Sequence, residues 1–182
     1  MTPATYKRGG RGAAIRYVTA PSPLGLLLVA ATRHGICRVT LGSSKRELAR
    51  ELKAEFPEAE VAPGAAGLES LARRVVRLVR GEAPSGELPL DLRATAFQWR
   101  VYKELLAIPR GQTRSYKEVA ERVGTPKGAR AVARVCATNP APFIVPCHRV
   151  VASDGTLGGY GFGLAKKAQI LKAETGKPSR RT

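Results

Sequence analysis

The sequence predicts an α+β fold in two parts: an antiparallel sheet with two helices comes first, and a mainly helical part with a helix-turn-helix follows. Three short apolar stretches rich in β-branched residues, at 14–20, 24–32 and 36–42, predict a meander of antiparallel strands because turn-like residues separate them. Apolar residues then recur at helical spacing in 44–56 and 67–81, which predicts two helices. Further along the chain the periodicity stays helical.

A change in composition marks the boundary between the two parts. The segment 81–92, GEAPSGELPLDL, has glycine and proline at both ends and is predicted to be the linker. The predicted organisation is a basic tail at 1–13, an α/β domain at 14–92, a helical domain at 93–176 and a basic tail at 177–182.

Capping patterns predict where the helices begin. A Ser or Thr followed three residues later by Glu or Gln can form a capping box, in which each side chain accepts a hydrogen bond from the backbone of the other residue. Such pairs are Ser44 with Glu47, Thr95 with Gln98 before the helix 95–108, and Ser115 with Glu118 before the helix 115–124. Thr125 and Pro126 have the usual N-cap and N1 order and are predicted to open the helix 127–139. The segment 146–163 is turn-rich and is predicted to be largely loop, and an amphipathic helix at 163–176 closes the domain.

Two of these helices are predicted to form a helix-turn-helix. A tight turn at Gly124, Thr125 and Pro126 joins them, and the second helix carries Lys127 and Arg130, with Arg134 one turn later. A generic helical hairpin would show the same pattern, so the pattern leaves both readings open.

The charge of the chain favours a polyanionic partner. A formal charge of +17 arises from 31 basic and 14 acidic residues among 182. Nucleic acid is the first candidate for such a surplus. The alternative is a compositional bias of the source genome, in which case the arginines of one helix are simply its solvated face: Arg73, Arg74, Arg77 and Arg80.

The sequence also predicts an intracellular protein with no membrane span. No apolar run approaches the roughly 18 to 20 residues that a spanning helix needs, and the first twelve residues lack the apolar centre of a secretory signal. Cys37, Cys136 and Cys147 cannot all pair and none forms a CxxC motif, so reduced thiols are expected. His34 and Cys37 have ligand-like spacing, but two ligands do not complete a tetrahedral zinc site, so no metal is expected.

A cysteine and a histidine stand side by side in PFIVPCHRVV, residues 142–151. A thiol reacts as the thiolate, and an unassisted cysteine with a pKa of about 8.5 is mostly protonated near neutral pH, so Cys147 would need a base or a positive field. His148 can supply the base directly or through a water, and a carboxylate on its other nitrogen would hold its tautomer. The alternative is a buried Cys147 beside a histidine that satisfies a backbone carbonyl, and these residues alone leave it open.

This stretch resembles the active-site signature of the O6-alkylguanine-DNA alkyltransferases, also called methylated-DNA–protein-cysteine methyltransferases. PCHRV follows an asparagine in TNPAPFIVPCHRV, residues 138–150, and precedes GTLGGYGFGL, residues 155–164. The similarity continues through 97–133 and the closing AETG, and residues 15–42 are similar to the C-terminal part of Ada-type proteins. The resemblance implies a ribonuclease-H-like first domain and a winged-helix-like second domain.

The resemblance also implies a role for each residue of the site. Cys147 would accept the alkyl group, with His148 as its base through a water and Glu174 as the carboxylate behind the histidine. Asn139 would brace the cysteine loop through backbone hydrogen bonds. Tyr116 would donate a proton toward N3 of the departing guanine.

Further residues would bind DNA and enclose the base. Arg130 matches the residue that enters the base stack where a nucleotide has flipped out, and Lys127, Arg134 and Ser115 would contact the DNA around it. The substrate pocket would comprise Tyr160, Gly161, Pro142 and Val150. Gly161 stands where other members have serine or arginine, which leaves open the range of alkyl groups accepted.

The implied function is DNA repair by a single, irreversible transfer of the alkyl group from O6-methylguanine, and from O4-methylthymine, to the protein's own cysteine. The implied partner is double-stranded DNA with an alkylated guanine, bound by a monomer without cofactor or metal, in the cytoplasm and on the nucleoid of a prokaryote. Two alternatives are a non-catalytic protein that binds alkylated bases, which the cysteine argues against, and a Cys-His hydrolase with many turnovers, which the basic surface disfavours.

The sequence departs from the resemblance at its beginning. The regulatory Ada members carry an N-terminal zinc domain with four cysteines that this chain lacks, and the zinc ligands of eukaryotic members are also missing. Residues 1–10 nevertheless resemble the tail of an AraC-type DNA-binding domain, so the chain is expected to be a separated or engineered piece of a longer Ada protein.

Overall fold

The computed structural model describes residues 9–64, 66–83 and 86–176, and these form two compact units. The first unit contains the described members of 1–76, 84–95 and 140–142, and the second contains those of 77–83, 96–139 and 143–182. In the described part of the chain, no helix combines the length and the apolar character that crossing a membrane requires.

Three antiparallel strands form the centre of the first unit, and this confirms the predicted meander. They are β1 (Ala14–Ser22), β2 (Gly25–Thr32) and β3 (Gly35–Gly42). The register pairs Val18 with Val29 and Val29 with Val39, so the β-branched residues of neighbouring strands lie opposite one another.

A fourth strand, β4 (Glu60–Pro63), joins the sheet in parallel to β1 and gives the order β3-β2-β1-β4. The sequence analysis did not predict it, and the sheet is therefore not purely antiparallel. The four residues EVAP are too short to show an alternating pattern, and they end in a proline. Pairing with β1 decides the strand, and the Gly64 N–H extends it by donating to the carbonyl of Tyr17 at 2.9 Å.

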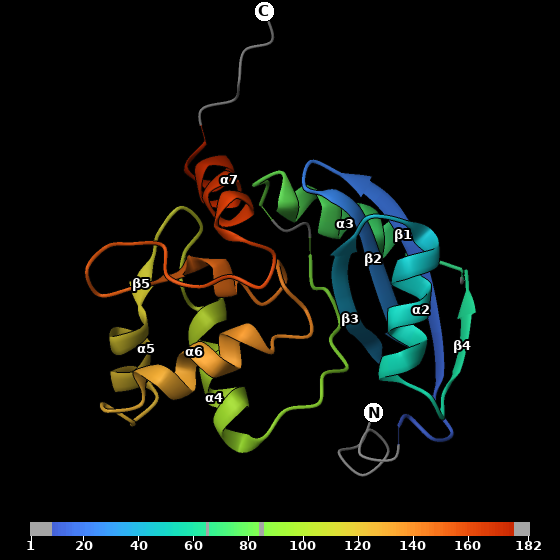
Figure 1. Cartoon of the computed structure of the whole chain (residues 1–182), viewed down its shortest axis with the longest axis horizontal. Coiled ribbons are helices and arrows are strands. Elements are labelled where there is room, and N and C mark those ends of the chain that lie inside the picture. Colours follow the sequence, from blue (N-terminus) through green and yellow to red (C-terminus); the bar gives the residue numbers. More distant parts are fainter. Residues whose placement is uncertain (1–8, 65, 84–85, 177–182) are drawn as a thin grey trace, which may run out of the picture. The chain divides into compact units, whose positions relative to one another are not determined.

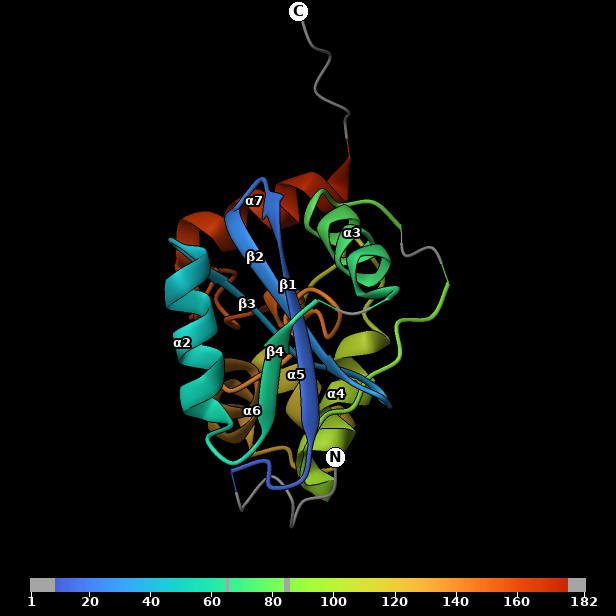
Figure 2. The same cartoon turned by 90° about the vertical axis from the view of Figure 1, so that its right-hand side faces the viewer.

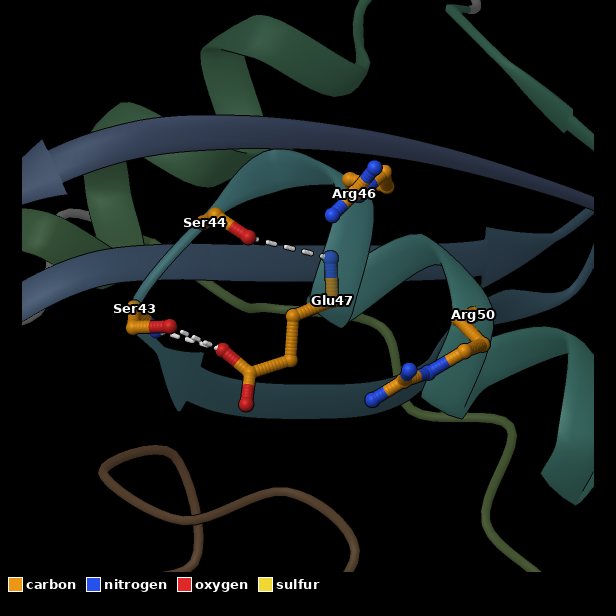
Figure 3. A pocket seen from close by; sticks show the side chains of 5 residues that line it. All are labelled: Ser43, Ser44, Arg46, Glu47 and Arg50. Atoms are coloured by element: carbon orange, nitrogen blue, oxygen red, sulfur yellow. Dashed lines mark hydrogen bonds between the residues drawn. The ribbon is translucent and has the colours of Figure 1, made fainter.

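The helix α2 (Lys45–Glu55) begins at the predicted cap. The Ser44 hydroxyl accepts a hydrogen bond from the Glu47 backbone N–H at 3.2 Å (Figure 3). The second half of the predicted capping box is wrong, because the Glu47 carboxylate accepts from the backbone N–H of Ser43 at 3.1 Å and from its hydroxyl. Glu47 thus binds the residue before the cap and satisfies a donor just outside the helix.

Helices lie on both sides of this sheet. Figure 2 shows α2 on one side and α3 (Leu68–Val79) on the other. Ile15 and Leu28 of the sheet pack against Leu48 and Leu52 of α2, and all four are almost fully buried. Because successive residues of a strand point to opposite faces, Leu27, which is also fully buried, points to the opposite face of the sheet.

The second half of the predicted linker is a structured part of the first unit and is not a plain connector, whereas residues 81–83 belong to the second unit. The Ile36 N–H donates to the carbonyl of Pro89 and the Asp91 N–H donates to the carbonyl of Ile36, each at 2.8 Å, and Leu90 forms a parallel bridge with Ile36. Gly35 permits this approach, because a Cβ there would lie 2.6 Å from the Pro89 carbonyl. Residues 84 and 85 of the segment lie outside the described residues.

The second unit is mainly helical, as predicted. Its helices are α4 (Ala96–Leu106), α5 (Tyr116–Arg122), α6 (Ala129–Ala137) and α7 (Leu164–Thr175), and a two-stranded parallel sheet joins β5 (Arg114–Ser115) to β6 (Val150–Val151). The segment 146–163 is largely loop, apart from β6 and a short 3₁₀ helix, η1 (Cys147–Arg149). The helices α5 and α6 pack together as the predicted helix-turn-helix (Figure 1).

The start of α6 corrects the sequence analysis. Thr125 and Pro126 do not open this helix, since Gly128 occupies the N-cap position. The Gly128 N–H instead donates to the carbonyl of Thr125 at 2.7 Å, which closes a four-residue turn. Proline second and glycine fourth are the residues that a type I turn favours, so the turn, and not the helix, accounts for Thr-Pro. The cap at Ser115 is confirmed with both halves of its capping box.

Candidate active site

Cys147 begins η1 inside the second unit and is 5% exposed. Its backbone N–H donates to the carbonyl of Val145 at 2.8 Å, and the Asn139 amide donates to the same carbonyl at 2.8 Å. Phe143 has a φ of 74°, a left-handed conformation that non-glycine residues seldom adopt. The loop before the cysteine thus has an unusual backbone shape and is held by hydrogen bonds, one of them from the Asn139 amide.

His148 and Glu174 meet although 26 residues separate them. His148 Nε2 lies 2.8 Å from Glu174 Oε1, and the side chains are only 2% and 3% exposed. Arg149 reaches the same carboxylate: its Nη2 donates to Oε1 at 2.8 Å and its Nε donates to Oε2 at 3.0 Å. The Gly111 N–H donates to Oε2 at 3.3 Å, so the carboxylate has donors on both oxygens.

These donors decide the charge states of the pair. Burial opposes the charged carboxylate, but the hydrogen bonds from His148 and Arg149 outweigh it and lower the pKa of Glu174 to about 2. Burial lowers the pKa of His148, and the Glu174 carboxylate opposes that shift only in part. Because an ionised carboxylate only accepts hydrogen bonds, the neutral imidazole carries its proton on Nε2.

That tautomer leaves Nδ1 of His148 with a free lone pair. The Nδ1 atom is buried and makes no hydrogen bond to a described residue. A buried nitrogen of this kind can take up a proton, since the Nε2–H bond to Glu174 stays in place while the ring becomes charged. The arrangement therefore has the chemical form of a general base.

The Cys147 thiol lies in a field with opposing contributions. Burial raises its pKa, whereas a hydrogen bond from Asn139, the positive charge of Lys167 and backbone N–H groups lower it. The thiol is therefore protonated at rest, and a neighbouring base is needed to generate the thiolate.

Lys167 is a fully buried cation on α7 that holds the loop after the cysteine. Its Nζ donates to the carbonyl of Val150 at 2.5 Å, to that of Leu157, and to that of Gly159 at 3.3 Å. Three carbonyl acceptors replace the water that this ammonium loses on burial. Burial nevertheless lowers the pKa of Lys167, and the nearby thiols raise it in part.

The small sheet of β5 and β6 brings Tyr116 to this loop. Arg114 pairs with Val150 and Ser115 with Val151, so the residue that opens α5 lies next to the segment that follows the cysteine. The Tyr116 hydroxyl donates to the carbonyl of Gly159 at 3.3 Å, the same carbonyl that Lys167 binds. Burial and the neighbouring thiols raise the pKa of Tyr116 to about 12, so its proton is retained at neutral pH.

Aromatic rings from the segments before and after the cysteine pack together. Phe143 stacks on Phe162 with ring centroids 6.0 Å apart, and Tyr160 meets Phe162 edge to face at 5.7 Å. The Tyr160 hydroxyl is buried and has no hydrogen-bond partner among the described residues. Gly161 is exposed, and a Cβ added there would meet nothing within 4 Å. A larger residue at 161 is thus sterically possible.

The other predicted site residues lie on α6 and the turn before it, at the start of α5, in β6 and in the first unit. Lys127, Arg130 and Arg134 are exposed, the first in the turn before α6 and the others on α6. Ser115 is the N-cap of α5, and Val150 is buried in β6. Pro142 is buried but belongs to the first unit, so it is not assigned to this pocket.

The sequence analysis missed Arg149 and Lys167. Arg149 stands next to the histidine in PCHRV. This position was the only sequence feature that could have indicated a role in the site. Lys167 follows an equally basic neighbour on an amphipathic helix, and only the interruption of the apolar face by a lysine could have drawn attention to it.

The pair His34 and Cys37 does not form a common site. His34 is exposed and accepts a hydrogen bond from Arg33 Nε at 3.1 Å, whereas the Cys37 thiol is buried and donates to the carbonyl of Ala30. Within the described ranges, no three His, Cys, Asp or Glu side chains gather closely enough to hold a metal ion.

The second unit thus combines a helix-turn-helix with a buried cysteine and a buried His-Glu pair, which defines an α+β protein with a thiol site in its helical unit. Comparison with known proteins gives the family. Residues 15–92 match the family model of the 6-O-methylguanine DNA methyltransferase ribonuclease-like domain, and residues 96–176 match the model of its DNA-binding domain. The chain therefore belongs to the O6-methylguanine DNA methyltransferase family.

Individual relatives cover most of the chain. It is 43% identical over 96% of its length to the bifunctional transcriptional activator/DNA repair enzyme Ada of Escherichia coli, and it spans about half the length of the two Ada relatives it matches. It is 39% identical to the methylated-DNA--protein-cysteine methyltransferase of Mycolicibacterium paratuberculosis, with 88% of this chain and 92% of the relative covered. A crystal structure of Mycobacterium tuberculosis OGT in complex with DNA is similar with a TM-score of 0.73 and 36% identity, covering 88% of this chain and 92% of that one.

The charge on Glu174 should make stability depend on pH. Since its folded pKa of about 2 lies below the ordinary 4.5, the carboxylate stabilises the fold fully above pH 4.5, and this contribution is lost as the pH falls toward 2. Glu174→Gln should therefore lower the free energy of unfolding by about 3 kcal/mol at pH 7, and the difference from wild type should shrink at low pH. Urea denaturation at several pH values measures this, and a difference that does not change with pH would refute the charge assignment.

Replacing Lys167 should loosen the loop that follows the cysteine. Lys167→Met removes the ammonium donor from the carbonyls of Val150 and Leu157, whereas the Gly159 carbonyl keeps the Tyr116 hydroxyl, and it should lower the free energy of unfolding by roughly 2 to 4 kcal/mol. It should also slow alkylation of Cys147 by iodoacetamide, because a charge that favours the thiolate is gone. Lys172→Met on the same helix is the control: that side chain is exposed, and its effect should stay within about 0.5 kcal/mol. Equal effects of the two substitutions would contradict the role given to Lys167.

Proposed function

We propose that this chain repairs alkylated DNA by moving the alkyl group from O6 of guanine to Sγ of its own Cys147. The observation that carries the proposal is a buried Cys147 followed in the chain by His148, whose buried ring is held in one tautomer by an ionised Glu174. Because the chain spans only about half of its Ada relatives, the proposal concerns the part of the protein that is present here.

The first step generates the nucleophile. The Cys147 proton passes by way of a water to Nδ1 of His148, and the Nε2–H bond to Glu174 stabilises the imidazolium that forms. Asn139 and Lys167 favour the thiolate through a hydrogen bond and a positive charge. Burial, which raises the pKa of the thiol at rest, also leaves the thiolate poorly solvated and therefore reactive.

The second step breaks the bond between the alkyl carbon and O6. The thiolate forms an S–C bond as the C–O bond breaks, and the electron pair of that bond goes to the guanine. Guanine leaves poorly as an anion, so Tyr116 donates its proton toward N3 as the charge develops. His148 then returns the thiol proton to the tyrosinate through solvent, which balances the reaction.

DNA binding would place the lesion at this site. The alkylated base is inaccessible within the duplex, so it must be flipped out before the thiolate can attack. The α5–α6 pair would lie against the duplex, where Ser115, Lys127 and Arg134 contact the backbone and Arg130 fills the space that the base leaves. Tyr160 and the loop at Gly161 would enclose the flipped base. A monomer suffices for this chemistry. The protein would act on the DNA of the nucleoid.

The product explains why each molecule acts once. A thioether has no bond that water or a base cleaves readily, so Cys147 is not regenerated.

The same chemistry applies to O4-methylthymine, whose alkyl carbon is also bound to an exocyclic oxygen. Of the two domains, 14–92 and 93–176, the second contains every proposed reacting group.

Intact mass spectrometry tests the transfer. After incubation with duplex DNA that contains O6-methylguanine, each protein molecule should gain one methylene, on the peptide that contains Cys147. Cys147→Ser should gain nothing, and Cys136→Ser should react like wild type. Repaired DNA with unmodified protein would point to a hydrolase, and unrepaired DNA bound tightly by wild type would point to a lesion-binding protein.

The position of Arg130 allows a second test that separates base flipping from general attraction to DNA. Arg130→Ala should slow repair of duplex O6-methylguanine roughly tenfold more than reaction with free O6-benzylguanine, because the free base is already unstacked. Rates from quenched single-turnover reactions give both numbers. The control is Lys127→Ala, which should weaken binding uniformly and reduce the dependence of log affinity on log salt by about one charge unit. Equal slowing of both substrates by Arg130→Ala would remove its proposed role.

A further inference from the structure

Arg149 makes more contacts with the relay carboxylate than the histidine does. Its Nη2 and Nε donate to the two oxygens of Glu174 at 2.8 and 3.0 Å, which is the bidentate geometry that arginine and carboxylate prefer. Its Nη1 donates to the carbonyl of Ile108 at 2.7 Å, so the guanidinium cannot rotate away without losing its hydrogen bonds to both Glu174 oxygens and to this carbonyl. The side chain is only 14% exposed, and solvent screens the pair weakly.

The shared oxygen has an electrostatic consequence. Glu174 Oε1 accepts from both His148 Nε2 and Arg149 Nη2, each at 2.8 Å. An unpaired carboxylate at that distance would strongly favour a charged imidazole. A carboxylate that is paired with a permanent cation forms a nearly neutral ion pair, and its pull on an imidazole proton is weaker.

We propose that Arg149 is a positioning residue for the transfer reaction: it holds Glu174 against the His148 ring and, by neutralising the carboxylate, keeps the resting imidazole neutral and able to accept the thiol proton. This proposal rests on the proposed function, because it assigns Arg149 a part in the same relay. The alternative is that Arg149 only connects η1 to the turn at Ile108. A role of that kind would not affect the charge of the His148 ring.

The other charged groups around His148 agree with this assignment. Glu174 and Lys167 face it from α7 and Arg149 adjoins it on η1. Burial lowers the pKa of His148, Glu174 raises it, and the charges of Arg149 and Lys167 lower it. Arg110, on the turn after α4, is exposed and its Nη2 donates at 3.4 Å to the Ala173 carbonyl.

Two substitutions separate charge from geometry. Arg149→Met keeps most of the side-chain length but removes the charge, and Arg149→Lys keeps the charge but loses the bidentate fork. In Arg149→Met, the pKa of His148, followed by the NMR signals of its ring carbons, should rise by about one unit. The acid limb of the methyl-transfer rate against pH should move up by the same amount.

In Arg149→Lys, the pKa of His148 should stay within a few tenths of a unit of wild type, and transfer should slow by a similar factor at every pH. The matched control, Arg110→Met, removes an exposed cation from the same region and should change neither quantity. If Arg149→Met folds too poorly to titrate, the ring nitrogen shifts of wild type still allow refutation, since an imidazolium at pH 6 would contradict the neutral Nε2–H tautomer that the proposal requires.

Three results would overturn the proposal: an unchanged pKa of His148 in folded Arg149→Met, an equal rise in Arg149→Lys, or an imidazolium at pH 6 in wild type. The titration of the ring does not require methyl transfer. A wild-type protein that transfers no methyl group would therefore refute the proposed function and leave the effect of Arg149 on His148 separately measurable.

Discussion

The site in the second unit depends on the hydrogen bonds that the buried Glu174 carboxylate accepts. This carboxylate takes hydrogen bonds from η1 through His148 and Arg149 and from the turn after α4 through Gly111. A charge in so dry a place is tolerated only when its lone pairs are satisfied, and here both oxygens have donors. The same carboxylate therefore joins three segments of the chain, sets the histidine tautomer and keeps its own charge. A change at this position would affect architecture and chemistry together.

Helix α7 positions the surroundings of the thiol from one of its faces. Lys167 and Glu174 are seven residues apart, which is close to two helical turns, so both project from the same side, with the buried Ile170 between them. The lysine holds the loop after the cysteine and the glutamate holds the histidine. One helix thus holds two irregular segments, a loop and a single-turn 3₁₀ helix, at a defined separation. Fixed positions of this kind favour a reaction in which the reacting atoms must lie within a few ångströms of one another.

Local features of this fold could be predicted from sequence, and distant ones only in part. The cap at Ser115 and the three-stranded meander follow from local patterns and are confirmed. Thr125-Pro126 fits both a helix start and a type I turn, and the local pattern does not choose between them. The meeting of His148 with Glu174 was expected only from family resemblance, since no spacing rule links residues 26 apart. Lys167 was missed because its partners are backbone carbonyls, which leave no trace in a sequence.

The location of Glu174 within α7 has a consequence for the dynamics of the site. It lies in the last turn of the helix, two residues before Gly176, which caps the end in a left-handed conformation. Terminal turns fray at lower free-energy cost than helix centres, and local opening needs no unfolding of the rest. Each fraying event would withdraw the carboxylate from His148 and Arg149, while α5 and α6 stay folded. The charge and tautomer of the His148 ring are thereby coupled to the order of a helix end that is separate from the helix-turn-helix.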